Sequence, residues 1–444
     1  MKPRVLLLNP PGSYPYTRDY FCSKVAKTLY VEHPIDLVVL SGVLWQEAEI
    51  RVLDAILRRL SPAEALDECA AFRPEVVFFL TGSASAWEDF PFLEKLKAKT
   101  SARLYGLGDI LRSERVVERL PWLDGALLDF MSDDALHLVR GEDTELQNAI
   151  VRSPRIRKFF RAARGECRIP VPRHESFIDK RYSFPFVRQL PFASVMTDFG
   201  CPYSCAFCVN GTLGYKTRPV ENVKEELEYL KQLGVKELFL RDETFGVPRP
   251  RAQTLAEALA EFSWTCFSRA DVLDAAFLKL IRDCGCHTVI VGVETGTAPS
   301  LREHKNLSLE RVRECFADAR ALGLETVGTF ILGLPGEDRA AAERTIEAAV
   351  SLGCDYASFN VFVPRADTPL SNGEWRGEIW DQSGILGARA NGILSAEEIR
   401  ALRKRAARRF YLRPGYLIGR LRATRLRNMG LALRNGIRLV RTLL

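Results

Sequence analysis

The sequence predicts an α/β protein with a Rossmann-like N-terminal domain, a partial (β/α)6 barrel and a C-terminal helical segment. Two observations lead to this fold class. Short apolar runs alternate with helical patterns twice, once in residues 1–150 and again in residues 191–370. These runs are nearly continuous, which is typical of parallel strands that helices cover on both faces. The length of 444 residues suits two to three domains of ordinary size.

The composition is that of a soluble globular protein, with 47% hydrophobic and 27% charged residues. No apolar run approaches the roughly 20 residues that a membrane span needs. The N-terminal "MKPRVLLLNPPG" lacks a small-residue cleavage site, so we interpret it as a first strand and not as a signal peptide. We therefore expect a cytoplasmic protein whose thiols are reduced.

Residues 1–150 contain the first strand–helix series, which predicts a doubly wound, parallel sheet. One helix is predicted to begin after Ser61, because Ser-Pro-Ala-Glu is a capping box with proline at the first helical position. The strands are expected at 4–10, 50–56, 75–82, 102–109 and 125–130.

Residues 151–190 form a predicted connector. The segment begins with a basic run and then becomes rich in proline and aromatic residues. Such a composition favours an irregular, partly extended link between the two domains.

Residues 191–370 contain the second series, with helical segments such as 220–234 between the strands. Six strand–helix units predict a parallel barrel that is incomplete compared with the eight-stranded form. In such barrels the chemistry is placed at the C-terminal ends of the strands. The strands are expected at 192–198, 237–243, 264–271, 288–294, 326–333 and 356–363.

Residues 371–444 begin with a Gly-rich stretch and end in a strongly basic region. The net charge of the chain is +7, but the segment from Arg400 to Leu444 has fourteen Lys/Arg and no Asp/Glu. The tail therefore carries +14 and the rest of the chain −7. The negative net charge of residues 1–399 and the absence of a nucleic-acid recognition motif argue against nucleic-acid binding.

An apolar stripe at helical spacing runs along this tail, and arginines border it. Such a helix either lies on an anionic membrane surface or packs its stripe on the barrel while the arginines stay in water. Both alternatives remain open at this point. The stripe consists of Leu426, Met429, Leu433, Ile437, Val440 and Leu444, and the bordering arginines are Arg427, Arg434, Arg438 and Arg441.

Three of the eleven cysteines, Cys201, Cys205 and Cys208, lie together in "TDFGCPYSCAFCVNG", directly after the first barrel strand. A disulfide is disfavoured in a reducing compartment. A structural zinc site normally has four protein ligands. Thiolates also hold iron–sulfur clusters, and three thiolates on a four-iron cube leave one iron open for chemistry. The other cysteines are mostly scattered singly through apolar segments, as buried free cysteines are.

The spacing resembles the signature of the radical S-adenosylmethionine (SAM) superfamily, Cys-x-x-x-Cys-x-aromatic-Cys, with Phe207 as the aromatic residue. The resemblance implies a 4Fe-4S cluster on the three cysteines and SAM on the open iron. It also implies an electron donor such as flavodoxin or ferredoxin. One electron from the cluster then releases a 5′-deoxyadenosyl radical from SAM, and the protein positions the cofactors.

The later strand ends are similar to SAM-binding positions of that superfamily. Asp242 and Glu243 would meet the amino group of SAM, although the sequence departs there from the common Gly-Gly-Glu form. A lone residue of this kind is more often an ordinary polar group at a strand end. Five strand ends in register with the cysteine triplet favour the SAM-binding interpretation instead. The resemblance further assigns Ser268 and Arg269 to the carboxylate or ribose, Glu294 to the ribose hydroxyls, and Phe207 and the segment 328–337 with Gly333 to the adenine.

A Rossmann-like domain before such a barrel resembles the cobalamin-binding group of the superfamily. The resemblance implies corrin or nucleotide-tail contacts from the strand-end loops "LLNPPG", "LTGSAS" and "GLGD". None of the five histidines lies in an Asp-x-His-x-x-Gly motif, so cobalamin would bind without a histidine ligand. The alternative is a domain that binds no corrin and only packs against the barrel. The implied contacts are Asn9, Thr81, Ser83, Gly106 and Gly108.

These features together predict an enzyme that methylates an unactivated carbon of a hydrophobic or natural-product substrate. A radical SAM enzyme that cyclises, oxidises or rearranges its substrate without methyl transfer is the second hypothesis. A non-catalytic iron–sulfur electron-transfer or sensor protein is the third. The basic tail adds the prediction of peripheral association with the inner face of a membrane.

Overall fold

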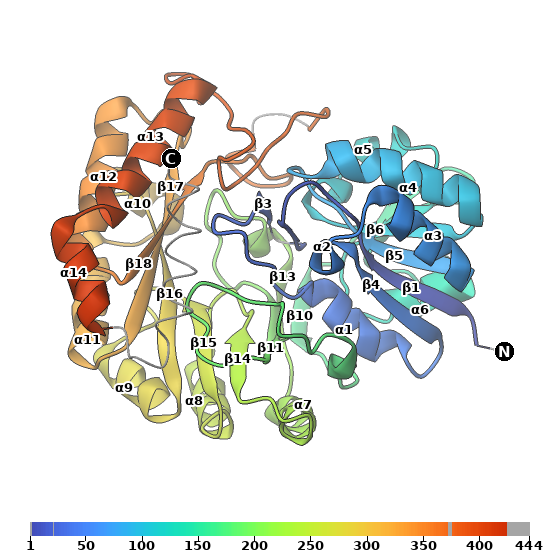
Figure 1. Ribbon diagram of the computed structural model, residues 1–444, viewed down its shortest axis with the longest axis horizontal. Coiled ribbons are helices and arrows are strands. Elements are labelled where there is room, and N and C mark those ends of the chain that lie inside the picture. The colour runs from blue at the N-terminus through green and yellow to red at the C-terminus, as the bar shows by residue number, and fades with distance from the viewer. Residues whose placement is uncertain (1, 21, 372–374, 424–444) are drawn as a thin grey trace.

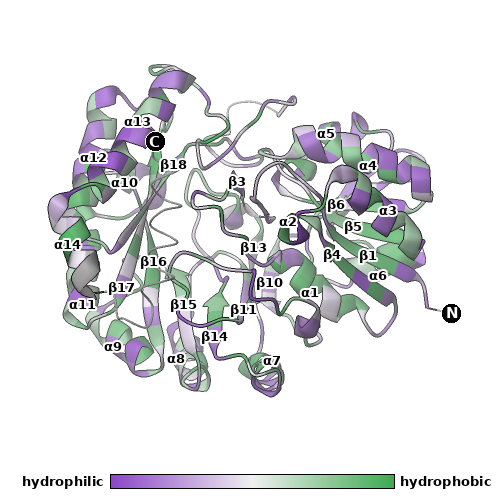
Figure 2. Cartoon of the chain, viewed as in Figure 1, coloured by the Kyte–Doolittle hydropathy of each residue, from purple (hydrophilic) through white to green (hydrophobic). Residues whose placement is uncertain are grey.

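A computed structural model describes residues 2–20, 22–371 and 375–423 of the chain. Two α/β halves lie side by side, each built on its own sheet (Figure 1). Apolar residues are concentrated on the strands, and polar residues on the outer surfaces of the helices (Figure 2). The predicted apolar stripe from Leu426 to Leu444 lies outside the described residues.

The first half contains a seven-stranded sheet in the order β4-β1-β5-β6-β7-β8-β9. The first five of these strands are parallel, and β8 and β9 are antiparallel. The strands are β1 Arg4–Asn9, β4 Glu49–Asp54, β5 Val76–Leu80, β6 Arg103–Leu107, β7 Gly125–Leu127, β8 Ala149–Arg152 and β9 Ile156–Phe159. The helices are α1 Ile35–Leu44, α2 Ala55–Arg58, α3 Pro62–Phe72, α4 Ala86–Thr100, α5 Glu114–Glu118 and α6 Asp134–Arg140.

The five predicted strands and the capping box of this half are present. The Ser61 side chain accepts from the Glu64 backbone N–H, and the Glu64 carboxylate accepts from Ser61 in return. The expectation of an irregular connector was wrong for its first part, because β8 and β9 extend the sheet. Charges on an exposed edge strand such as β9, with Arg157 and Lys158, hide the apolar alternation that marks a strand.

The second half contains six parallel strands, as predicted, and they form one sheet in the order β11-β14-β15-β16-β17-β18. Because β11 and β18 are the two ends of this order, the barrel is open between them. The strands are β11 Phe192–Val195, β14 Glu237–Leu240, β15 Ser263–Ser268, β16 Cys286–Glu294, β17 Glu325–Leu332 and β18 Tyr356–Val361. Its helices are α7 Val220–Gln232, α8 Arg249–Ala258, α9 Ala275–Asp283, α10 Ala298–Lys305, α11 Leu309–Ala321, α12 Arg339–Leu352, α13 Ala396–Tyr411 and α14 Pro414–Ala423.

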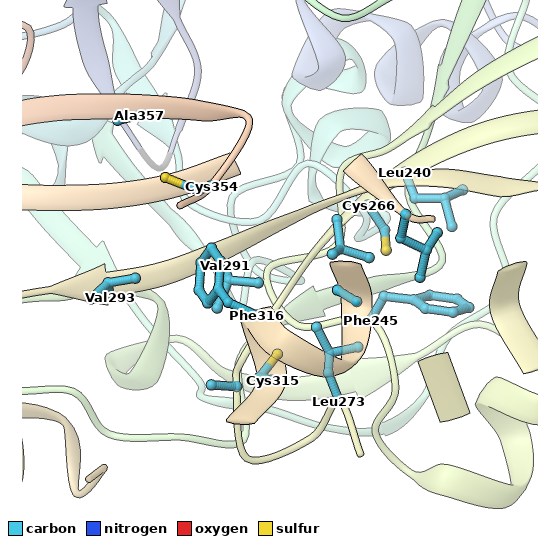
Figure 3. Close-up of a cluster of buried hydrophobic side chains, with 14 of the residues drawn as sticks. Leu240, Phe245, Cys266, Leu273, Val291, Val293, Cys315, Phe316, Cys354 and Ala357 are labelled. Carbon is cyan, nitrogen blue, oxygen red and sulfur yellow. The ribbon is translucent and has the colours of Figure 1, made fainter. Parts of the chain in front are cut away.

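The main core of this half lies between the sheet and its outer helices. Leu240, Cys266 and Val291 from the strands pack there with Phe316 and Leu273 (Figure 3). Burying each large apolar side chain contributes roughly 1.5–3 kcal/mol. The core therefore holds the strand ends rigidly where the sequence predicts chemistry.

Smaller elements lie between the halves. The hairpin of β2 (Tyr16–Arg18) and β3 (Ser23–Val25) extends from the end of β1 toward the barrel (Figure 1). Arg241 at the end of β14 fixes the segment that contains this hairpin, through ion pairs with Asp19 at 2.7 Å and Glu32 at 3.1 Å. A second small sheet joins β10 (Ala163–Glu166), β13 (Gly214–Thr217) and β12 (Asp198–Gly200) beside the barrel mouth.

Candidate functional site

A cavity of about 1040 Å³ occupies the inside of the open barrel. Its wall includes the C-terminal ends of β14 to β18 and side chains of α13 and α14. From the first half it includes Asp19, Cys22, Lys24, Lys27, Thr28, Tyr30 and Glu32. Pockets for one small ligand usually measure roughly 300–1,000 Å³. The cavity is therefore at the upper end of the range for a ligand pocket.

The loop between β12 and β13 brings Cys201, Cys205 and Cys208 to this cavity. Gly200 begins the loop at a φ of +78°, where a Cβ atom would lie 2.0 Å from the carbonyl oxygen of Gly214. The Cys208 N–H donates to the Cys205 carbonyl at 3.0 Å, which closes a tight turn. The sequence thus fixes three thiols on one short, compact loop at the barrel mouth.

Burial raises the pKa of Cys201 to about 11 and that of Cys208 to about 12. Burial also raises the pKa of Cys205, while the charges of Lys305 and Arg269 act in the opposite direction. Binding of iron must therefore displace protons from these thiols.

In the residues that the structure describes, no group of three or more His, Cys, Asp or Glu side chains is arranged to hold a single metal ion. The three cysteines are predicted to bind three different irons of one cube. Such a cluster needs its three thiol ligands on the wall of one open space. Cys201, Cys205 and Cys208 all line the cavity, so their location fits a cluster.

Arg269, at the end of β15, links the cysteine loop to the next strand ends. Its guanidinium donates to the Cys205 Sγ at 3.3 Å and to the Lys305 carbonyl at 3.1 Å. It also lies 4.0 Å above the ring of Tyr203 and pairs with Asp271 at 3.0 Å. Arg269 is therefore held in place beside one of the predicted iron ligands.

Glu294, at the end of β16, faces the same cavity. Its Oε1 accepts from the Lys305 ammonium at 2.7 Å, and both side chains are almost completely buried. Glu294 has a φ of +67° beside a register shift in the strand. A residue other than glycine is strained in this conformation, and such strain is concentrated at functional sites.

Glu243 and Ser268 complete the group of predicted SAM contacts on the cavity wall. Burial, followed by the charge of Asp19, raises the pKa of Glu243 to about 8. An ammonium group next to this carboxyl would favour its charged form. The Ser268 hydroxyl donates to the Phe245 carbonyl at 2.7 Å.

Two predicted SAM contacts do not reach the cavity. The Asp242 carboxylate instead accepts from the backbone N–H of Thr197 at 2.5 Å and from its hydroxyl at 2.6 Å. Asp242 therefore anchors the end of β11. Gly333 lies at the end of β17, where its N–H donates to Glu337 at 2.5 Å. Phe207 does line the cavity, beside Ile331.

The five predicted corrin contacts are all engaged within the protein. The Thr81 hydroxyl donates to Asp89 at 2.8 Å, and the Ser83 hydroxyl donates to Asp109 at 2.9 Å. A Cβ atom on Gly106 would lie 2.2 Å from the Leu111 side chain, and one on Gly108 would lie 2.0 Å from the Thr81 carbonyl. These glycines are explained by packing, and their contact with a corrin stays a prediction.

Arg18 of the hairpin fills the crevice where this sheet would be expected to bind a ligand. The parallel strands have the flavodoxin-like order, in which ligands bind between the ends of β1 and β5. The completely buried Arg18 side chain lies there, donates to Asn9 at 2.9 Å and pairs with Asp89 at 2.7 Å. Seven residues of the first half, from Asp19 to Glu32, therefore line the cavity, and its strand-end loops do not.

The loop between β18 and α13 covers the same edge of the sheet (Figure 1). The backbone N–H of Trp380 donates to the Ser83 carbonyl at 3.2 Å, and the Asp381 carboxylate accepts from the backbone N–H of Val25 at 3.1 Å. Arg365, in the same loop, forms a buried ion pair with Asp109. Through these contacts the loop, which follows the last strand of the second half, binds to the first half.

Sequence reasoning missed several residues of the site. Lys305 pairs with Glu294 but lies on a separate helix, α10, with no motif around it. Tyr203 is inside the cysteine signature, where a ring two residues after the first cysteine was an available signal. Lys27 and Arg403 also line the cavity, from segments far apart in the chain.

The chain is similar to known proteins over this region and beyond. The model of the radical SAM superfamily matches residues 197–349, which include the three cysteines and the ends of β14 to β17. An uncharacterized methyltransferase of Pyrococcus horikoshii is 26% identical over 439 residues, which cover 87% of this chain and 89% of that protein. The cytidylyl-2-hydroxyethylphosphonate methyltransferase of Streptomyces wedmorensis is 28% identical over 43% of this chain and 39% of its own length.

A solved structure has a similar fold. The radical S-adenosylmethionine methyltransferase TsrM from Kitasatospora setae, with cobalamin and a 4Fe-4S cluster bound, matches with a TM-score of 0.65. The match covers 84% of this chain and 74% of TsrM at 19% identity. Both α/β halves and their connection are therefore a fold that TsrM shares.

Proposed function

We propose that this chain, which contains a radical SAM domain, is an enzyme that methylates an unactivated carbon of a small-molecule substrate, with cobalamin as the methyl carrier. The observation that carries the proposal is the shared cavity wall: Cys201, Cys205 and Cys208 face the same space as Arg269 and Glu294. The methyltransferases named among its relatives support the reaction class. The cobalamin in TsrM supports the carrier.

The chain's own residues have distinct roles in this proposal. When bound, the cluster and SAM supply a 5′-deoxyadenosyl radical, and cobalamin supplies the methyl group. The three cysteine thiolates hold the cluster on a compact loop. Glu294 accepts hydrogen bonds from the ribose hydroxyls of SAM, and Glu243 accepts from its ammonium group. The seven residues of the first half that line the cavity, from Asp19 to Glu32, are the part of that half that would meet cobalamin.

A radical SAM oxidation, cyclisation or rearrangement without methyl transfer is the second candidate. One observation favours it: Arg18 and the loop with Trp380 fill the edge of the first sheet, where a corrin was expected. This arrangement suits a domain that closes the barrel without binding cobalamin.

Anaerobic reconstitution with iron, sulfide and cobalamin separates the two candidates. We expect about four irons and one corrin per chain, and formation of 5′-deoxyadenosine when the reduced protein receives SAM. An electron donor such as flavodoxin or ferredoxin is expected to replace the chemical reductant. Cluster assembly and 5′-deoxyadenosine without any bound corrin would favour the second candidate. A reduced cluster that leaves SAM intact would contradict both.

The substrate is proposed to be partly hydrophobic. The inner face of the barrel offers it aromatic and branched apolar side chains, among which the rings of Phe239 and Phe267 stack with centroids 5.4 Å apart. This apolar surface consists of Phe186, Phe239, Phe267, Ile290, Val327 and Tyr356.

Peripheral membrane association through the basic tail is a further part of the proposal. Leu412 and Leu417, both about half exposed at 49% and 48%, lie where α13 and α14 border the cavity. No helix in the described part of the chain has the length and apolarity that crossing a membrane requires. The apolar residues at this corner lead into the arginine-rich tail, a combination that suits an anionic lipid surface.

Deleting residues 424–444 tests this association. The deletion begins after α14 and does not remove the hydrogen bond from the Tyr416 hydroxyl to the Asp355 carbonyl, so we expect α14 to stay folded. We expect less of the truncated protein than of the full chain to sediment with anionic vesicles, with equal iron content after reconstitution. Equal sedimentation of both proteins would contradict a membrane role of the tail.

A further inference from the structure

One wall of the cavity carries two cationic side chains, Lys27 and Arg403, that form no ion pair with a carboxylate among the described residues. Lys27, from the segment after the hairpin, projects to the inner face of β18. Its ammonium group donates to the Ser358 hydroxyl at 2.8 Å and to the Asn360 amide oxygen at 2.6 Å. Both acceptors are neutral. Among the described residues, no carboxylate lies within ion-pair distance of this ammonium.

Arg403, on α13, is the second cation of this wall. Its side chain is only 4% exposed, and its Nε has no hydrogen-bond partner among the described residues. The Asp381 carboxylate acts on the charges of Arg403 and Lys27, but no ion pair joins it to either side chain. The Asp381 oxygens are already engaged by donors from its own loop and from Val25.

An uncompensated buried cation is costly unless a partner of opposite charge arrives. Burial, followed by the charge of Arg403, lowers the pKa of Lys27 well below its usual range. The charge of Lys24, which also lines the cavity, acts in the same direction. An anion between Lys27 and Arg403 would relieve this repulsion and complete their hydrogen bonding.

We propose that Lys27 and Arg403 bind an acidic group of the substrate, a carboxylate or a phosphate. The inference rests on the proposed function, since it assigns this wall of the same cavity to the substrate. Neighbouring strands lie about 4.8 Å apart, and β17 separates β18 from β16. The acidic group is therefore held roughly 10 Å from Glu294, with Thr329 and Ile331 of β17 between them. The apolar side chains of β14 and β15 line the same cavity on the other side of Glu294. The geometry describes an amphiphilic substrate with an acidic end.

Binding of simple amphiphiles tests the assignment. The reconstituted protein, loaded with cluster, cobalamin and SAM, is titrated by calorimetry with octyl phosphate, octanoate and 1-octanol. We expect at least one of the two anions to bind more tightly than the alcohol, and the tighter anion identifies the acidic group. Lys27→Met and Arg403→Met should each weaken binding of that anion by about tenfold or more, and leave 1-octanol unchanged.

Arg188→Met is the matched control. Arg188 also lines the cavity, but it pairs with Glu325 at 3.2 Å and is 41% exposed. We expect this variant to bind the anions with an affinity within twofold of that of the unchanged protein.

Three outcomes would overturn the proposal: equal binding of anion and alcohol, absence of anion binding at millimolar concentration, or unchanged anion affinity in both Lys27→Met and Arg403→Met. Anion binding only in protein without cobalamin would also overturn it, since the cations would then serve the corrin. Because no step of the test needs SAM cleavage, its failure is distinguishable from failure of the proposed function.

Discussion

Replacing Cys205 with alanine is expected to prevent assembly of the four-iron cluster and to reduce 5′-deoxyadenosine formation below detection. The physical reason is the ligand count: with two thiolates left, a second iron of the cube loses its protein ligand. In the unchanged protein the Cys205 sulfur also accepts a hydrogen bond from Arg269 at 3.3 Å, and the alanine variant loses this contact. Iron and sulfide analysis after anaerobic reconstitution, together with product analysis by chromatography, measures both effects.

Cys284→Ala is the control for this variant. Cys284 is a free cysteine of intermediate exposure at the end of α9, outside the cavity wall. It should bind the same iron as the unchanged protein and form 5′-deoxyadenosine at the same rate. A Cys205→Ala protein that retains a full cluster and cleaves SAM would show that the cube is held by other ligands.

The Glu294–Lys305 pair gives the second large expected effect. Glu294→Ala leaves the buried Lys305 ammonium without its carboxylate, which should lower the free energy of unfolding by about 3–5 kcal/mol. It also removes the predicted acceptor for the ribose hydroxyls. A hydrogen bond to a charged group contributes about 1.5–3 kcal/mol, so SAM affinity should fall by roughly ten- to one-hundredfold.

A double variant separates the two consequences. In Glu294→Ala/Lys305→Met no charge is left unpaired, so most of the lost stability in denaturant unfolding should return. The affinity for SAM, measured by equilibrium dialysis, should stay low. Recovery of SAM affinity together with stability would mean that Glu294 acts only through Lys305 and does not contact SAM.

The strands and the cysteine loop could be predicted because their signals are local. Apolar runs mark the buried parallel strands, and the cysteine spacing lies within one short segment. The strands β8 and β9 gave no such signal, since the basic residues of an exposed edge hide the pattern. Asp242 and Glu243 show another limit: neighbouring residues at a strand end point to opposite sides. Only Glu243 faces the cavity, and the sequence does not say which of the two does.

The rest of the site depends on long-range contacts. Lys305 reaches Glu294 from a different helix, and Lys27 and Arg403 meet the same cavity from opposite parts of the chain. Their positions follow from how the hairpin segment and α13 close over the open edge of the barrel. The buried Arg18 is a similar case, because nothing in its surroundings in the sequence indicates that it occupies the crevice between β1 and β5.

The proposed chemistry requires that one iron of the cluster has no protein ligand and binds SAM. Electron paramagnetic resonance of the reduced, reconstituted protein, recorded with and without SAM, detects this binding. We predict that SAM changes the signal of the cluster, because the amino and carboxylate groups of SAM become ligands of the open iron. An identical signal in both samples, in protein with a full four-iron content, would mean that SAM does not bind the cluster.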